Sequence, residues 1–189
     1  MLKIFVDGLC EPVNPGGIAC FGYVIYEGDS KLTENCGVVD TSYPTNNVAE
    51  YTAAIEALLW VQSQKRDDPI TIFSDSQLLV YQMNGFYSVS APRIIPLYKK
   101  LSALLKNRKV KFRWIPREKN QEADNLSRRA YDKYLVDNPR IFERFRSNFA
   151  TDKQKALLER LKIPYPVNIS KREASKLISE RLNKLKGDH

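Results

Sequence analysis

The amino-acid sequence predicts an α/β protein: a five-stranded mixed sheet flanked by helices, followed by a small all-α C-terminal extension. Three observations lead to this fold class. Short β-prone runs joined by brief polar links open the chain, which is typical of an antiparallel meander. Helical and β-prone segments then alternate, which favours parallel crossovers joined to the same sheet. The last part of the chain shows helical patterns only.

The meander is expected to consist of strands over residues 2–6, 18–26 and 31–39, which are rich in β-branched and aromatic residues. The first strand is expected to end at Asp7 and Gly8, because this pair reads as a turn. The turn signals between the runs are short, so consecutive strands should pair as neighbours.

The rest of the sheet domain alternates between helices and strands. Asn46 or Asn47 is the expected N-cap of the first helix. Parallel strands need crossover connections, and the helices supply them. The expected elements in chain order are a helix over 49–62, a strand over 70–73, helices over 77–83 and 94–105, a strand over 110–115 and a helix over 120–134.

A boundary is predicted at 137–139, which divides the chain into a domain of residues 1–136 and an extension of residues 137–189. Helices are expected over 140–148, 153–161 and 170–185, with Thr151 and Ser170 as N-caps. Residues 136–189 carry 13 Lys and Arg against 7 Asp and Glu, which is six of the eight excess positive charges of the chain. A basic appendage suggests a polyanionic partner, and a solvated helical face is the alternative.

Composition excludes several classes of protein. Hydrophobic residues make up 43% of the 189 residues, which is enough for a packed core, and no run is long enough to span a membrane. The N-terminus does not resemble a signal peptide, and Cys10, Cys20 and Cys36 lack metal-site spacing, so a cytoplasmic protein with reduced thiols is expected. The only histidine is His189, which argues against most histidine-dependent mechanisms.

Four carboxylates lie where an expected strand ends or an expected helix begins. Adjacent strand ends in one sheet are close in space, so the four should converge and repel one another unless a cation neutralises them. Hard oxygen ligands without histidine favour Mg²⁺ or Mn²⁺. Taken singly, each could instead be an ordinary turn, capping or first-turn acid. They are Asp7, Glu50, Asp75 and Asp124.

The segments around these acids carry recognisable motifs. They are Phe5–Gly8 with Asn14–Ala19 (FVDG and NPGGIA), Thr45–Ala53 (TNNVAEYTA), Phe73–Val80 (FSDSQLLV) and Trp114–Asp124 (WIPREKNQEAD). All four, in this order, resemble the motifs of ribonuclease H, type 1, over about residues 1–135. Each motif carries one of the acids, so the match as a whole is more specific than any one motif.

The resemblance implies that Asp7, Glu50, Asp75 and Asp124 hold two Mg²⁺ ions, with Mn²⁺ as a substitute. It implies an endoribonuclease that hydrolyses the RNA strand of an RNA–DNA hybrid and leaves 5′-phosphate and 3′-hydroxyl ends. Such an enzyme must read 2′-hydroxyl groups across the minor groove. The candidates are Asn14, Asn46, Asn47 and Gln77, together with the backbone from Gly8 to Cys10, although the amides could simply cap helices or turns.

The sequence departs from bacterial relatives in two places. Arg117 stands where they carry a histidine, as in archaeal-type relatives, and it is expected to hold a phosphate rather than act as a base. Only about eight residues, 85–92, link the two middle helices, so a basic protrusion is not expected. Arg117 could also be a solvent-facing loop charge.

Several alternatives remain open. The extension could bind nucleic acid, which would replace the missing protrusion, or it could be a helical hairpin packed on the core. The activity could extend to double-stranded RNA or be that of a 3′–5′ exonuclease, and a non-catalytic binding protein is a third possibility, although all four acids are present. We expect a monomer whose partner is an RNA–DNA hybrid, with no membrane association.

Overall fold

A computed structural model describes residues 1–187, so His189, the single histidine, lies outside the described residues. Its centre is a five-stranded sheet with the spatial order β3-β2-β1-β4-β5, which confirms the predicted mixed sheet. The strands β1, β2 and β3 pair antiparallel, whereas β1, β4 and β5 pair parallel. Their bounds are β1 Leu2–Glu11, β2 Ile18–Glu27, β3 Ser30–Val38, β4 Ile70–Ser74 and β5 Val110–Trp114.

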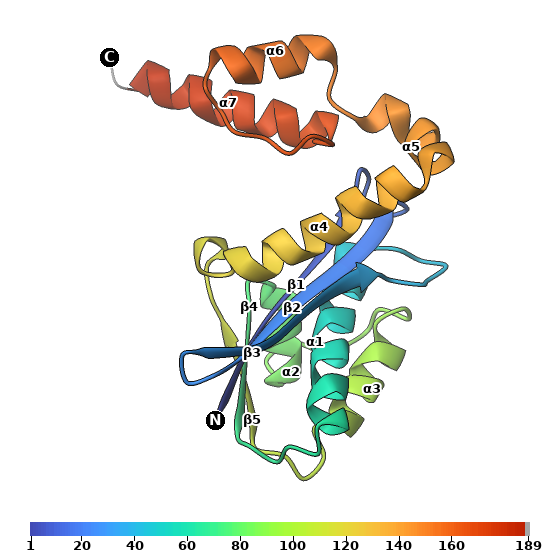
Figure 1. Cartoon of the computed structure of the whole chain (residues 1–189), viewed down its shortest axis with the longest axis vertical. Coiled ribbons are helices and arrows are strands. Elements are labelled where there is room, and N and C mark those ends of the chain that lie inside the picture. The colour runs from blue at the N-terminus through green and yellow to red at the C-terminus, as the bar shows by residue number, and fades with distance from the viewer. Residues whose placement is uncertain (188–189) are drawn as a thin grey trace.

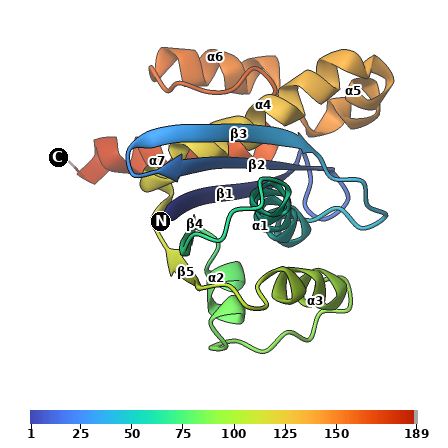
Figure 2. The same ribbon diagram turned by 60° about the horizontal axis from the view of Figure 1, so that its bottom comes forward.

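Helices cover both faces of this sheet (Figure 2). One face packs against α1 (Asn46–Ser63), α2 (Gln77–Met83) and α3 (Ile95–Leu104), and the apolar side chains between them form the main core. The opposite face carries α4 (Gln121–Asp137), which a short 3₁₀ turn, η1 (Arg117–Lys119), precedes. None of the described helices is both long enough and apolar enough to cross a membrane.

Two local expectations were wrong. The first strand does not end at Asp7 but runs to Glu11, because β2 pairs with it along its whole length, from Leu2 opposite Glu27 to Glu11 opposite Ile18. The cap of α1 is Thr45 rather than Asn46 or Asn47. The Thr45 hydroxyl accepts a hydrogen bond of 3.1 Å from the Val48 amide, so both asparagines lie in the first turn and their side chains are exposed.

The expected all-α extension is present, and its helices are α5 (Pro139–Phe145), η2 (Arg146–Asn148), α6 (Asp152–Arg160) and α7 (Lys171–Gly187) (Figure 1). Thr151 caps α6 as expected and forms a reciprocal capping box with Gln154. The Ser170 hydroxyl accepts a hydrogen bond of 3.2 Å from the Glu173 amide at the start of α7. Apolar side chains such as Leu158 and Ile169 give α6 and α7 a small core of their own.

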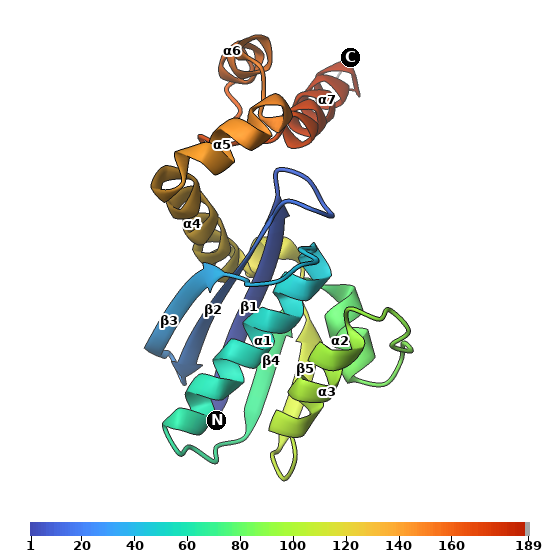
Figure 3. The ribbon, with the colours of Figure 1, turned by 90° about the vertical axis from the view of Figure 1, so that its right-hand side faces the viewer.

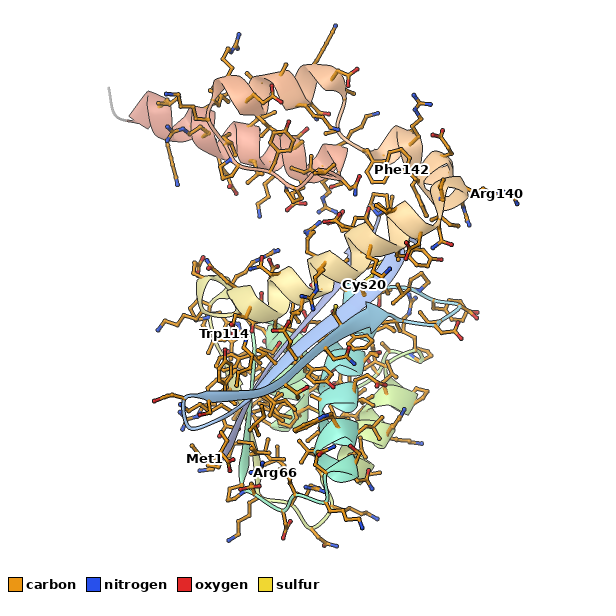
Figure 4. The ribbon with its side chains drawn as sticks, viewed as in Figure 1. Met1, Cys20, Arg66, Trp114, Arg140 and Phe142 are labelled. Atoms are coloured by element: carbon orange, nitrogen blue, oxygen red, sulfur yellow. The ribbon has the colours of Figure 1, made fainter. Side chains whose placement is uncertain are left out.

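The extension also packs against the sheet domain. Phe149, whose ring stacks on Phe142 of α5 at a centroid distance of 4.8 Å, belongs to an apolar cluster with residues of β1, β2 and α4. Phe142 and Arg140 lie on α5, where the chain turns away from the end of α4 (Figure 4). The Asn168 side chain donates a hydrogen bond of 3.0 Å to Asp132 of α4. The hairpin is therefore anchored on the sheet domain by apolar and polar contacts.

Candidate active site

Asp7 lies in the middle of β1, opposite Gly22 of β2, and is 5% exposed. Gly22 allows α4 to approach the sheet at this point, because a Cβ on Gly22 would lie 2.5 Å from the Ser127 amide nitrogen. The close approach brings the Ser127 hydroxyl to the Asp7 carboxylate, to which it donates a hydrogen bond. A buried carboxylate in a central strand is thus held by one side chain of α4.

Glu50 reaches the same place from the first turns of α1. The helix start lies directly against β1 at Gly8, where a Cβ would be only 2.2 Å from the Glu50 amide nitrogen. Gly8 is therefore needed for this close contact between helix and strand. The Ser74 hydroxyl, at the end of β4, donates a hydrogen bond of 3.3 Å to a Glu50 carboxylate oxygen. Glu50 is 7% exposed.

Asp75 follows the last residue of β4, beside the part of β1 that extends past the end of β4. The Asn120 side chain donates one hydrogen bond of 2.9 Å to the Val6 carbonyl and another of 3.2 Å to Asp75 Oδ1. The Trp114 indole donates a hydrogen bond of 3.0 Å to the Asp75 carbonyl. The loop between β5 and α4 thus fixes Asp75 against β1.

These three carboxylates form one cluster. One oxygen from each of Asp7, Glu50 and Asp75 lies within 4.8 Å of the other two. Burial raises the pKa of Asp7 to about 7 and raises that of Glu50 well above its usual range, and the neighbouring acids add to both effects. The pKa of Asp75 is also raised, mainly by burial. These three close oxygen donors, two buried and one half-buried, have disfavoured ionised forms and fit a hard divalent cation such as Mg²⁺.

Asp124 lies in the first turn of α4, at the edge of this cluster. Its carboxylate forms an ion pair of 2.6 Å with the Arg117 guanidinium and is not among the three carboxylates that lie within 4.8 Å of one another. Its charge nonetheless raises the pKa of Asp7. Arg117 comes from η1, and 62% of its side chain is exposed. The guanidinium can therefore reach both Asp124 and an anion in solvent.

A cleft of about 970 Å³ opens onto the carboxylates. All four acids and Arg117 line it, as do most of the predicted substrate-binding residues: Cys10, Asn14, Asn46 and Asn47. The Asn14 side chain accepts a hydrogen bond of 3.2 Å from the Asn46 amide, which ties the loop after β1 to the start of α1. Gln77 is exposed at the start of α2 and is not among the residues that line the cleft. Its role stays a prediction.

The residues that orient the acids were not singled out from the sequence. Asn120 lies in the last motif, where it was expected only to begin a helix, and its partner, the Val6 carbonyl, is 114 positions away. Ser127 bonds Asp7 across 120 positions. Asp124 and Ser127 are three residues apart, or about one turn of α4, and therefore lie on the same face of the helix. This spacing could have indicated that Ser127 lies near the acids. Nothing in the sequence distinguished Ser74 except its position directly before Asp75.

Comparison with known proteins gives a consistent result. A family model described as reverse transcriptase-like matches residues 8–130. A bifunctional protein of Mycobacterium tuberculosis is 33% identical in an alignment of 129 residues that covers 63% of this chain and 32% of that protein. The chain thus spans about a third of the length of the first mycobacterial relatives it matches.

Two further relatives match over nearly their whole length. The ribonuclease H of Geotalea uraniireducens is 31% identical in an alignment of 153 residues that covers 73% of this chain and 99% of that protein. The solved structure of LC11-RNase H1, from a compost metagenome, in complex with an RNA/DNA hybrid is 35% identical with a TM-score of 0.66. That match covers 71% of this chain and 99% of the solved chain.

Proposed function

The chain belongs to the ribonuclease H family, and we propose that it is an endoribonuclease that hydrolyses the RNA strand of RNA–DNA hybrids. The observation that carries the proposal is the cluster formed by buried Asp7 and Glu50 with half-buried Asp75 in an open cleft. The complex of the LC11 relative with an RNA/DNA hybrid supports the choice of substrate. The products would carry 5′-phosphate and 3′-hydroxyl ends.

The four acids would hold two Mg²⁺ ions, with Mn²⁺ as a possible substitute. When bound, such ions activate the attacking water and stabilise the departing 3′ oxygen. The chain keeps the ligands in place beforehand: Ser127 orients Asp7, Ser74 orients Glu50 and Asn120 orients Asp75. Because these supports are buried, the acids need little rearrangement when a cation enters.

The other residues of the cleft would position the substrate. Arg117 would hold a phosphate of the scissile strand, because its guanidinium is exposed and carries several donors beside Asp124. The exposed amides of Asn14, Asn46 and Asn47 would bond 2′-hydroxyl groups, since an amide can both donate and accept. Gly8, Leu9 and Cys10 line the same cleft, and their backbone would join these contacts.

We also propose that the basic extension contributes to binding of the substrate, because it carries most of the net positive charge. The enzyme would act as a monomer, and a cytoplasmic location would keep Cys10, Cys20 and Cys36 reduced; the structure contains them as free thiols.

The test is a comparison of substrates. The purified chain is incubated with end-labelled RNA–DNA hybrid, double-stranded RNA and double-stranded DNA of the same sequence, each with Mg²⁺ and with EDTA. We expect cleavage of the RNA strand of the hybrid only, and only with Mg²⁺. Cleavage of double-stranded RNA at a similar rate would show that the activity extends to this substrate. An intact hybrid in all conditions would refute the proposal.

A further inference from the structure

The cleft that contains the four acids does not end at the sheet domain. Its other side is lined by residues of the extension, among them Lys171, Arg172 and Lys176 from the first two turns of α7. Figures 1 and 3 show α7 on the side of the molecule away from α2 and α3. The cleft therefore contains both the four acids, which favour a cation, and a group of basic side chains.

The first turns of α7 are fixed in this position by several contacts. The segment before α7 pairs with the chain after η2, where the Ala150 amide donates a hydrogen bond of 2.9 Å to the Ile169 carbonyl. Gln154 of α6 donates a hydrogen bond of 3.1 Å to the Lys171 carbonyl. Glu173 of α7 lies 3.8 Å from Arg128 of α4, and both side chains are largely buried. α7 is therefore tied to α6 and to the sheet domain.

The charges of these basic residues are available to a ligand. Among the described residues, Lys171 and Arg172 form no ion pair, and Lys176 makes only a long contact of 3.8 Å with exposed Glu180. All three side chains are exposed. The exposed ion pair between Lys176 and Glu180 contributes little to the stability of the fold. Stability alone therefore does not explain why the three basic residues line the cleft.

We propose that α7 forms the second wall of the substrate cleft, where Lys171, Arg172 and Lys176 bind backbone phosphates of the same duplex whose RNA strand reaches the four acids. The inference rests on the proposed function and makes it more specific, because it places the phosphate contacts of the extension beside the site of cleavage. The duplex would lie between the amides at the start of α1 and the basic residues of α7, and both walls would position it.

Removal of the whole extension would be an ambiguous test. Phe149 and other apolar residues of the extension pack against β1, β2 and α4, so truncation would expose apolar surface and destabilise the chain. Charge removal on the surface avoids this difficulty. We therefore compare the triple variant K171A/R172A/K176A with the control K153A/R160A/R181A. The control also removes three exposed charges of the extension, but from positions that do not line the cleft.

The readouts are KM, kcat and the salt dependence of binding on a short RNA–DNA hybrid. Each phosphate contact that is lost should flatten the slope of log affinity against log salt by up to about 0.9, so the cleft variant should lose roughly 2–3 from this slope. Its KM at about 0.1 M salt should rise roughly tenfold while kcat is largely retained. The cut positions should also become less sharply defined relative to the hybrid end.

The outcomes separate this inference from the proposed function. If the cleft variant and the control show the same KM and the same salt slope, the basic residues of α7 do not bind the duplex at the cleft, although hybrid cleavage by the unmodified chain still stands. If the unmodified chain does not cleave the hybrid, the proposed function fails. Fluorescence anisotropy with the same labelled hybrid in Ca²⁺ then still tests phosphate binding by α7. Equal melting temperatures of both variants would exclude a folding defect.

Discussion

The backbone of Gly8 and the start of Glu50's helix are in direct contact. A Cβ on Gly8 would lie 2.2 Å from the Glu50 amide nitrogen and 2.4 Å from the carbonyl carbon of Ala49. Because these neighbours are backbone atoms, no rotation of a side chain could relieve the clash. The distance between β1 and α1, and with it the position of Glu50 beside Asp7, depends on the absence of a side chain at Gly8.

We expect Gly8→Ala to impair both the fold and the site. The added methyl group should push the start of α1 away from β1, which separates Glu50 from Asp7 and costs roughly 1–3 kcal/mol of stability. Hybrid cleavage should fall by at least tenfold. The matched control is Gly37→Ala on β3, whose Cβ would meet only the Phe21 ring at 3.0 Å. Equal activity and melting temperature for the two variants would contradict this packing argument.

Asp7→Asn should stabilise the metal-free protein above neutral pH. Burial raises the pKa of Asp7 from 3.8 in the reference state to about 7 in the fold, so its ionised form is disfavoured there. The resulting loss of stability is absent below about pH 3, grows as the pH rises and is complete above about pH 7. In EDTA at pH 8, the free energy of unfolding of the variant should therefore exceed that of the unmodified protein by about 2–4 kcal/mol. The melting temperature of the variant should be higher by roughly 5–10 °C.

The same melting curves provide the control. The stability difference between Asp7→Asn and the unmodified protein should vanish below about pH 3, because Asp7 is then protonated in both the folded and the unfolded state. Added Mg²⁺ should raise the melting temperature of the unmodified protein more than that of the variant, since the variant lacks one charged ligand. A difference that does not change with pH would show that burial of the Asp7 charge does not destabilise the fold.

Arg117 should act through its guanidinium rather than as a base. Arg117→Ala should reduce hybrid cleavage by roughly 10- to 100-fold, as expected for the loss of a charge-assisted hydrogen bond to phosphate. Arg117→Lys should retain an intermediate activity, because lysine keeps the charge but lacks the planar group. Steady-state kinetics on the hybrid at pH 7–9 distinguish the variants. Activity unchanged in both would make Arg117 a solvent-facing loop charge.

The amides at the start of α1 provide a test of sugar recognition. Asn47 lines the cleft and does not cap the helix, since Thr45 does so. Asn47→Ala should therefore weaken hybrid cleavage by roughly 1–3 kcal/mol in kcat/KM without a change in metal affinity. Gln77→Ala serves as the comparison, because Gln77 is exposed but is not among the residues that line the cleft. Unchanged kinetics in Asn47→Ala would exclude it from substrate recognition.

The order and type of the elements could be predicted from the sequence because their patterns are local. The alternation of helical and strand periods indicated the mixed sheet, and the turn residues separated the strands. The end of β1 could not be predicted in this way. Gly8 reads locally as a turn residue, but it continues β1 because β2 pairs with this strand as far as Glu11.

The acids of the site could be predicted from their positions and motifs, whereas the groups that orient them could not. Ser127 and Asn120 reach Asp7 and Val6 from more than 110 positions away, and only the tertiary fold brings them together. Likewise, nothing in the sequence indicated that Lys171 lines the cleft. Charge indicated a basic extension, but which of its residues line the cleft depends on the contacts of Phe149, Asn168 and Glu173 with the sheet domain.

The most direct test of the central claim is Mg²⁺-dependent cleavage of an RNA–DNA hybrid by the unmodified chain and by Asp7→Asn, measured side by side with a labelled RNA strand. We predict that the unmodified chain yields fragments with 5′-phosphate and 3′-hydroxyl ends in Mg²⁺ and none in EDTA. Asp7→Asn, although folded, should yield none in either condition. Cleavage that persists in EDTA, or near-normal turnover by Asp7→Asn, would contradict the assignment of the carboxylate cluster as a catalytic metal site.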